Sequence, residues 1–264
     1  FQALDLAVKL EGQMFDLATL RSSGFFDQSS RTILWNAVAE PLLANLAPGQ
    51  EGKVFFEIDL KDDFPNTFGA KNFSLKVSPV LKTFSVPPDF GLDEISVSSS
   101  LITKISSKVT FTSQAVYGGS VLPNSGPVPP RVGQKTTYTV NWKIINEGND
   151  LTNIRVVSFL PPGVTWENNY RLTTSQSDIK YDPSLGRISW SVSTIPTGIG
   201  TISGDFAGFQ IGIMPGVNQA GQGVDLIKET TFEAIDNFTK EDIMFTRSKI
   251  TTSTVSDSPG TVQP

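Results

Sequence analysis

Cysteine and histidine are both absent from this sequence. Their absence excludes Ser-His and Cys-His nucleophiles, imidazole general bases, and metal sites built on thiolate or imidazole ligands. Catalysis would have to rely on a carboxylate pair, a lysine or a tyrosine, and no acidic residue lies in a sequence context that suggests a raised pKa. We therefore expect no enzymatic activity. Without cysteine no disulfide contributes to stability, so apolar cores must hold the fold.

Long apolar runs and basic patches are also missing. No apolar run reaches the roughly 18 residues of a membrane span, so none is expected. Only 18% of the residues are charged, the net charge is -5, and no basic patch suited to nucleic acid is visible. The chain begins Phe-Gln-Ala-Leu, without a methionine or a signal peptide, so we expect a fragment or a processed product.

One stretch of the sequence occurs twice. An aromatic residue, Asp, Ser, Ile and Trp recur in register between residues 26–35 and 181–190, each pair 155 residues apart. The Asp-x-Ser segment predicts a tight turn, because both side chains can hydrogen-bond to nearby backbone. The Ile-x-Trp that follows alternates with the period of a strand that has one face in a core. Each copy therefore predicts a turn that leads into a core strand.

Short segments with alternating apolar residues run through the whole chain. The clearest alternation is Tyr138, Val140, Trp142 and Ile144. Residues typical of turns separate these segments, and none of them shows a long apolar stripe of helical period. The sequence therefore predicts an all-β protein.

Two units follow from the repeat. Residues 103–107 (Thr-Lys-Ile-Ser-Ser) resemble residues 248–252 (Ser-Lys-Ile-Thr-Thr), so one unit ends as the next does. We predict a first unit over 1–100, a second over 101–255, and a linker or tail over 256–264.

The first unit is expected to be incomplete, because nothing in it matches residues 101–155. A sandwich that lacks those strands would expose a sheet edge and part of its core. Either this chain is cut from a longer one that holds the missing strands, or a neighbouring molecule donates a strand.

Four segments in series carry a resemblance to a known family. They are Gly-Pro-Val-Pro-Pro to Thr-Tyr-Thr-Val-Asn-Trp (126–142), Asn-Glu-Gly-Asn-Asp (146–150), Leu-Pro-Pro-Gly-Val-Thr-Trp (160–166) and Gly-Arg-Ile-Ser-Trp (186–190). Together they resemble the immunoglobulin-like repeat domains of bacterial and archaeal cell-surface proteins, well from about 101 to 253 and partially over 1–100. The resemblance implies tandem immunoglobulin-like β-sandwich domains, exported and displayed on the cell surface.

The resemblance implies no activity, because such repeats serve as stalks, spacers, adhesin segments or surface-layer parts. The leading interpretation is a structural element (stalk, sheath or surface-layer component) that acts through strand edges and domain junctions. Its partners would be other copies of itself or neighbouring domains of the same long chain. The alternative is an adhesin-type module that recognises a glycan or a surface protein through loops 118–133 and 167–178. An uncovered edge strand would favour assembly, and an exposed aromatic pair beside polar residues would favour adhesion.

The four tryptophans are candidates both for the core and for a sugar site. Trp35, Trp142 and Trp190 each alternate with aliphatic residues, so we assign them to the core. Trp166 is followed by the polar residues 167–169 (Glu-Asn-Asn), and either role fits it.

Two clusters of oxygen-bearing side chains could bind calcium: Asp59, Asp62, Asp63 and Asn66, and, more sparsely, Asp236, Glu241 and Asp242. Ca²⁺ requires about six to eight oxygen ligands, and neither cluster has the spacing of a known calcium loop. A solvated acidic loop is the preferred interpretation, with Asp59, Asp62 and Asp63 as the calcium candidates. No other cofactor is expected.

Covalent modification has four candidate positions. Lys9 and Lys143 could form an intramolecular amide with an asparagine, but each lies on the strand face opposite the apolar residues, whereas such a bond requires a lysine in the core. Asn72 and Asn237 fit the N-glycosylation sequon, which occurs by chance in a chain rich in serine and threonine.

Overall fold

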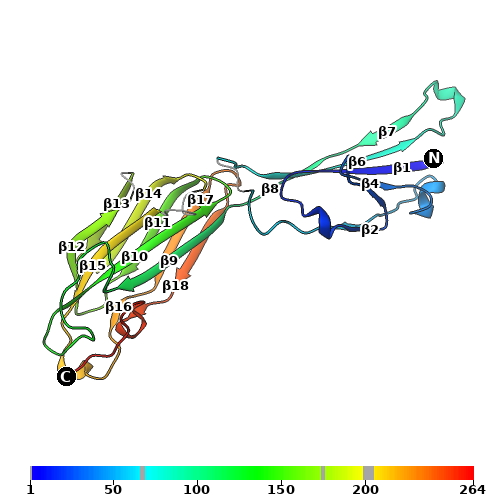
Figure 1. Ribbon diagram of the computed structural model, residues 1–264. Coiled ribbons are helices and arrows are strands. Elements are labelled where there is room, and N and C mark those ends of the chain that lie inside the picture. Colours follow the sequence, from blue (N-terminus) through cyan, green and yellow to red (C-terminus); the bar gives the residue numbers. More distant parts are fainter. Residues whose placement is uncertain (1, 66–68, 174–175, 199–204) are drawn as a thin grey trace. The chain divides into compact units, whose positions relative to one another are not determined.

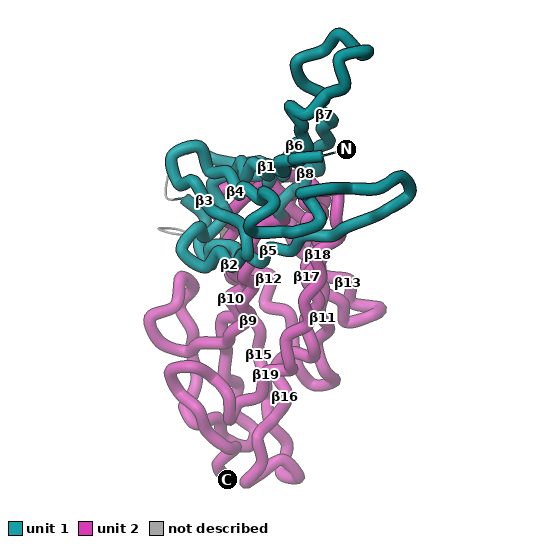
Figure 2. Tube along the Cα trace, turned by 90° about the vertical axis from the view of Figure 1, so that its right-hand side faces the viewer, with its two compact units in different colours: residues 1–105 teal, residues 106–264 magenta. Residues whose placement is uncertain are grey.

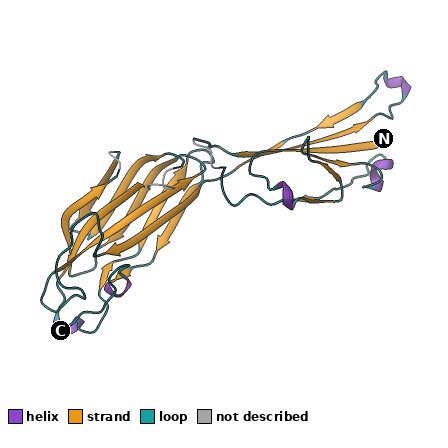
Figure 3. Cartoon of the chain, in the orientation of Figure 1, coloured by secondary structure: helices purple, strands orange, loops and turns teal. Residues whose placement is uncertain are grey.

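The structure, a computed structural model, describes residues 2–65, 69–173, 176–198 and 205–264. Its regular structure consists of strands, with a few short 3₁₀ helices and no α-helix in the described part (Figure 3). None of the described helices has the length and apolar character needed to cross a membrane. The all-β prediction is confirmed. The chain divides into two compact units, residues 1–105 (unit 1) and residues 106–264 (unit 2), shown in different colours in Figure 2.

Unit 2 contains two large antiparallel sheets (Figure 1). One has the order β12-β15-β10-β9, with bounds Val164–Leu172, Asp205–Ile213, Thr136–Glu147 and Lys108–Val116. The other has the order β13-β14-β11-β17-β18, with bounds Ser177–Asp182, Arg187–Ile195, Leu151–Phe159, Thr230–Asp236 and Asp242–Arg247. A small sheet pairs β16 (Asp225–Ile227) with β19 (Ile250–Thr251), and the 3₁₀ helices are η4 (Val217–Gln219) and η5 (Thr252–Thr254).

The inner faces of both large sheets share one apolar core. Alternate residues of β10, Tyr138 to Ile144, are completely buried, as the period of two predicts. Trp142 packs edge-on against Phe209 of β15, with ring centroids 4.8 Å apart. Trp190 of the opposite sheet belongs to the same core. Unit 2 is therefore a complete immunoglobulin-like β-sandwich.

Unit 1 contains one large antiparallel sheet and one small sheet. The large sheet has the order β3-β4-β1-β6-β7, with bounds Phe25–Asp27, Thr32–Trp35, Leu4–Glu11, Ser74–Thr83 and Ile95–Ser98, and β8 (Leu101–Lys104) also pairs with β6. The small sheet pairs β2 (Arg21–Ser22) with β5 (Phe56–Glu57). The 3₁₀ helices are η1 (Leu17–Thr19), η2 (Pro41–Ala44) and η3 (Pro88–Phe90).

Unit 1 reproduces part of the sandwich of unit 2. The order β3-β4-β1-β6-β7 corresponds to β13-β14-β11-β17-β18, and the pair β2-β5 corresponds to β12-β15. No strand in the described part of unit 1 corresponds to β9 or β10. In the described residues the second layer of unit 1 therefore has two strands where that of unit 2 has four, which is the arrangement expected of an incomplete first unit.

The repeated turns have the predicted geometry. The carboxylate of Asp27 accepts hydrogen bonds from the backbone N–H (2.9 Å) and the hydroxyl (2.7 Å) of Ser29. The carboxylate of Asp182 accepts the same two bonds from Ser184, at 3.0 and 2.6 Å. The strands that follow bury Trp35 and Trp190, and Trp142 is also buried, so these three core assignments are confirmed.

The boundary between the units lies between residues 105 and 106, five residues beyond the predicted end of the first unit at residue 100. Residues 101–104 form β8, which pairs with β6 in the register already set by β7: Val80 faces Ser98, and Val77 faces Leu101. The ladder on β6 therefore holds these residues in unit 1.

Residues 256–264 are not a free linker or tail. Val262 is fully buried, and its backbone N–H donates to the carbonyl of Gln222 at 3.0 Å. Gln263 forms a parallel bridge with Arg131, and Asp257 accepts from the backbone N–H of Tyr117 at 2.9 Å. The segment Ser-Asp-Ser-Pro-Gly has the composition of a linker, but the valine and the backbone bonds fix it to the sandwich.

Candidate functional site: strand edges and a surface aromatic cluster

One edge of the large sheet of unit 1 is formed by β7 and β8, which together act as a single strand along β6. The two share one register, and the N–H of Ser99 between them donates to the carbonyl of Pro79 at 3.1 Å. Val97, Leu101 and Ile102 are 65%, 66% and 60% exposed. No strand in the described part of the chain pairs with the outer side of this edge. Unpaired backbone groups beside exposed apolar side chains form a template for another strand.

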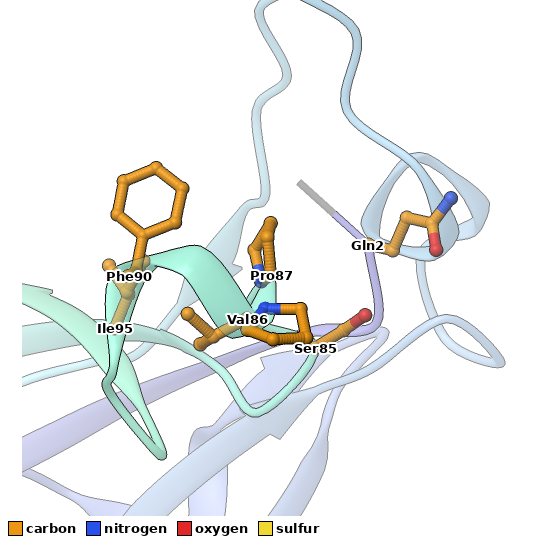
Figure 4. A pocket seen from close by; sticks show the side chains of 7 residues that line it. Gln2, Ser85, Val86, Pro87, Phe90 and Ile95 are labelled. Atoms are coloured by element: carbon orange, nitrogen blue, oxygen red, sulfur yellow. The ribbon is translucent and has the colours of Figure 1, made fainter.

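The tip of the hairpin formed by β6 and β7 exposes three large apolar side chains. Phe84, Phe90 and Leu92 are all exposed there. Between the tip and the start of the chain lies an open groove, lined by Gln2, Ser85, Val86, Pro87, Pro88, Phe90 and Ile95 (Figure 4). None of these lining residues carries a charge, so the groove offers apolar contact and has no acid–base pair.

A cluster of aromatic side chains lies on the surface of unit 2, where β12 and β13 are the edge strands of the two sheets. The ring of Trp166 stacks on that of Tyr181, with centroids 5.5 Å apart and an interplanar angle of 16°. Tyr170 lies on the same strand as Trp166, with the two ring centroids 6.4 Å apart, and is 48% exposed. Trp166 also contacts the buried ring of Phe209. Trp166 thus lies between the core and the surface: its ring contacts the core at Phe209, and its neighbour Tyr170 is exposed.

Polar side chains lie next to these rings because β12 is irregular. Its register against β15 shifts between Trp166 and Tyr170, and Asn168 has a φ of 53°. Within this bulge Glu167 accepts from the ammonium of Lys135 at 2.7 Å and from the hydroxyl of Thr165 at 2.6 Å. Burial acts to raise the pKa of the Glu167 carboxyl, but these donors hold it below its usual value. The site combines flat aromatic faces with ordered polar groups.

The predicted loop 167–178 is therefore mostly strand. Residues 167–172 continue β12 beyond the bulge, and residues 177–178 begin β13; positions 174–175 lie outside the described residues. The prediction of a loop was wrong, because a left-handed Asn168 lets the strand continue through the polar run Glu-Asn-Asn.

The loop 118–133 is a loop, as expected, and it is fixed to the sandwich. The amide of Asn124 donates to the carbonyl of Tyr117 at 2.8 Å, and the phenol of Tyr117 donates to the carbonyl of Gly126 at 2.7 Å. Gln210 of β15 donates to the carbonyl of Pro123 at 2.7 Å. These bonds restrain the loop along its length.

The calcium candidates are not brought together as a three-carboxylate site. Asp59, Asp62 and Asp63 are exposed, and Asn66 lies outside the described residues. The described part of the chain holds no group of three or more acidic side chains placed to share a metal ion. The backbone of Asp59 instead pairs with residue 16, whose N–H donates to the Asp59 carbonyl at 2.9 Å.

The second acidic cluster has a structural centre in Asp236. Its buried carboxylate accepts from Asn149 (2.9 Å), from the N–H and hydroxyl of Ser107 (both 2.8 Å), and from the N–H groups of Phe238 (2.8 Å) and Thr239 (2.9 Å). Burial opposes ionisation, but these donors lower the pKa of Asp236 to about 2.

The other members of this cluster do not join Asp236 around a metal. Glu241 accepts from the hydroxyl of Ser106, and Asp242 begins β18. The network therefore ties the start of β9, the β10–β11 turn and the β17–β18 turn together.

The four modification candidates all lie on the surface. Lys9 and Lys143 are exposed, on the faces away from the core as the alternation indicates, and Lys9 pairs with Glu11 at 3.6 Å. Asn72 and Asn237 are exposed as well, and the side-chain oxygen of Asn237 accepts from the ammonium of Lys240 at 2.9 Å.

Sequence reasoning missed the partners of Trp166 and the exposed edge at 95–104. Tyr170 and Tyr181 come from two strands of different sheets, so no local pattern joins them to Trp166. The sequence did contain a signal for the edge strand: Ser-Val-Ser-Ser-Ser at 96–100 has few apolar residues for a strand within a sheet.

No family model matches this chain, and no curated protein matches its sequence. Some solved structures are similar to it at low sequence identity. The C-terminal domain of the Streptococcus pyogenes antigen I/II-family protein AspA is 13% identical, with a TM-score of 0.38, and the match covers 94% of this chain and 84% of that chain. The C-terminal domain of the Streptococcus agalactiae AgI/II polypeptide BspA is 12% identical, with a TM-score of 0.36 and coverage of 92% and 83%.

BcpA, the major pilin subunit of Bacillus cereus, is 9% identical, with a TM-score of 0.37; the match covers 95% of this chain and 64% of that chain. Similarities of this degree assign no function to the chain. The functional proposals below therefore depend on its own residues.

Proposed function

We propose that this protein is a non-enzymatic structural element of an exported cell-surface protein, in a stalk, sheath or surface layer, and that copies of it associate through strand edges. The observation that carries this proposal is the outer edge formed by β7 and β8, which is unpaired in the described structure and has apolar side chains exposed on both faces. The motifs shared with immunoglobulin-like surface repeats support the location.

The sequence of this edge is self-complementary. If two copies pair antiparallel around Ser99, Val97 of one copy faces Leu101 of the other. Cross-strand apolar pairs each contribute about 0.2–1 kcal/mol, and a two-fold axis repeats this pair. The pairing would also satisfy the outer backbone groups of both edges.

Sedimentation velocity over a wide concentration range tests this proposal. We expect the unchanged chain to form larger species as its concentration rises. Replacing Val97 and Leu101 by Glu places like charges opposite one another across the two-fold axis, so this variant should stay monomeric. Val38, 92% exposed but outside the edge, provides the matched control, and Val38→Glu should associate like the unchanged chain. A monomer at every concentration would refute assembly through this edge.

A second function is favoured by the aromatic cluster of Trp166, Tyr170 and Tyr181. Aromatic faces stack on the apolar faces of sugars, and Glu167 and Asn169 lie within the same bulge. In this role the protein would be an adhesin-type module, and loop 118–133 would contribute to the same ligand-binding function. A glycan array probed with the full chain tests it: a specific signal should be lost in Tyr170→Ala and kept in Phe25→Ala, which removes an exposed ring from unit 1. Equal signals from both variants would exclude the cluster.

A further inference from the structure

The small sheet of unit 1 leaves one edge of β5 without a strand. Its sheet has only two members, β2 and β5, so each has one partner in the described structure. In unit 2 the corresponding strand β15 lies between two partners, β12 and β10. The position that β10 fills in unit 2 is therefore open in the described part of unit 1.

The pairing of β5 and its extension fixes which residues correspond. The isolated bridge between Phe15 and Leu60 matches the pair Trp166 and Ile211. The pair Ser22 and Phe56 matches Leu172 and Ala207. Both ladders contain an irregularity between these points, formed by η1 in unit 1 and by the bulge of β12 in unit 2. Phe56, Ile58 and Leu60 thus stand where Ala207, Phe209 and Ile211 stand in unit 2.

Burial differs sharply between the two sets. Ala207, Phe209 and Ile211 are all 0% exposed, whereas Phe56 and Ile58 are only partly buried and Leu60 is 45% exposed. The difference has a direct cause in unit 2, where β10 covers the second edge of β15. The large residues Trp142, Val140 and Tyr138 of β10 lie opposite Ala207, Phe209 and Ile211.

The backbone of β5 is oriented to accept such a strand. The N–H of Asp59 donates to the hydroxyl of Thr19 at 2.8 Å, and the N–H of Lys61 donates to the carbonyl of Met14 at 2.9 Å. Backbone groups in an extended strand alternate in direction, so those of Ile58 and Leu60 point toward the open edge. A strand placed there would pair with these groups and cover the three apolar side chains.

We propose that the open edge of β5 binds an extended segment of another polypeptide chain that is not a second copy of β5, antiparallel to β5 and, like β10, with large apolar side chains at every second residue. The strand β10 shows the required chemistry: its residues Tyr138, Val140 and Trp142 would face Leu60, Ile58 and Phe56. Binding by strand addition takes affinity from main-chain hydrogen bonds and specificity from alternate side chains. This edge is distinct from the one formed by β7 and β8, so the inference does not depend on the function proposed above.

Disulfide trapping tests both the site and the register, since the chain has no cysteine of its own. The full chain carrying Leu60→Cys is mixed with a synthetic peptide of residues 134–148 carrying Tyr138→Cys, and the Phe56→Cys chain with a Trp142→Cys peptide. Exchanging the peptides separates the sulfurs by four residues along the strand, about 13 Å, which is too far for a disulfide. We expect the matched pairs to cross-link roughly tenfold or more faster than the exchanged pairs.

Two results of the trapping experiment would overturn the proposal. Equal cross-linking rates for matched and exchanged pairs would show that the peptide does not bind β5 in one defined register. A Leu60→Cys chain that forms its own disulfide dimer in preference to the peptide adduct would assign the edge to a second copy of β5.

Hydrogen exchange of the unchanged chain, measured with and without the unchanged peptide, tests the same proposal. This measurement does not depend on whether a cysteine variant folds. Residues 53–61 should gain protection when the peptide is added. Protection confined to residues 205–213 would show that the peptide replaces β10 in unit 2, and would also refute the proposal.

Discussion

Arg31 and Gly186 occupy the same turn position in the two copies of the repeat, and both have left-handed backbone, with φ of 54° and 63°. Each follows an Asp-x-Ser turn and precedes the strand that carries a core tryptophan, Trp35 or Trp190. Glycine adopts this conformation without steric cost, whereas a side chain there costs about 1–2 kcal/mol. The two copies therefore form the same turn, but the copy with Arg31 has the higher conformational energy.

Exchanging these residues should move stability in opposite directions. Arg31→Gly removes the strain and should stabilise unit 1 by about 0.5–1 kcal/mol, after the greater freedom of the unfolded chain is deducted. Gly186→Ala should destabilise unit 2 by about 1 kcal/mol or more, because a Cβ there would also lie 3.1 Å from the carbonyl oxygen of Leu160. Urea unfolding measures both.

Gly119→Ala serves as the control for the conformational cost alone, since Gly119 has a φ of 58° and a Cβ there would meet nothing within 4 Å. A destabilising Arg31→Gly would contradict the assignment of strain to this turn.

Asp236 should make unit 2 sensitive to acid. Its pKa is about 2 in the folded protein, below the ordinary value of 3.8, because five hydrogen bonds favour the ionised form. Because the carboxyl has a lower pKa in the folded protein, it stabilises the fold at pH values above its pKa in the unfolded chain. This contribution is lost as the pH falls from about 4 toward 2. We expect Asp236→Asn to lose about 2–4 kcal/mol at neutral pH and to show a flatter stability profile over that pH range.

Urea unfolding at a series of pH values checks this. The matched control is Asp225→Asn, which removes an exposed ion pair with Lys249 (2.9 Å) and should cost less than about 1 kcal/mol. If the free energy of unfolding of Asp236→Asn fell with pH as steeply as that of the unchanged chain, the acid sensitivity would come from other residues.

Tyr138 should titrate far above an ordinary tyrosine. Its buried hydroxyl has no hydrogen-bond partner in the described structure, and burial raises the pKa to about 12. Since the unfolded chain ionises first, stability contributed by the neutral phenol is lost as the pH rises from about 10 through 12. The difference between ultraviolet titrations of the unchanged chain and Tyr138→Phe should show one group ionising near pH 12.

The same variant should keep or slightly raise the free energy of unfolding at neutral pH, because it removes an unsatisfied buried polar atom without a large cavity. A loss above about 1 kcal/mol would mean that the hydroxyl has a partner in solution.

The core tryptophans should respond differently to replacement by phenylalanine. The indole N–H of Trp142 donates to the hydroxyl of Ser113 at 3.1 Å, whereas that of Trp190 has no partner in the described residues. Both replacements leave a cavity, but only Trp142→Phe also loses a hydrogen bond. We expect Trp142→Phe to cost about 1 kcal/mol more than Trp190→Phe in urea unfolding. Equal costs would show that the Ser113 bond adds nothing.

Local patterns predicted the elements well, because they depend on residues close together in the chain. The Asp27 and Asp182 turns follow from side chains that bond to backbone two residues away. The buried face of β10 follows from the alternation of Tyr138 to Ile144, since a strand turns every second side chain to one side. The missing strands of unit 1 followed from the repeat itself.

Patterns that depend on distant partners could not be predicted in this way. Val262 lies in a segment with the composition of a linker, and its burial depends on a surface formed by other parts of unit 2. The end of unit 1 moved beyond residue 100 because β6 provides a ladder for Leu101.

The sequence by itself determined the class of fold, the repeated turns and the incompleteness of the first unit, because turn chemistry and period-two alternation are local. The tertiary structure alone decided which edges are open. It placed Val97 and Leu101 on an edge that no described strand pairs with, left Leu60 half exposed where Ile211 is buried, and brought Tyr181 to Trp166. The physical reason is that strand pairing and burial are non-local: a side chain is covered or exposed according to the strands beside it, which come from elsewhere in the chain.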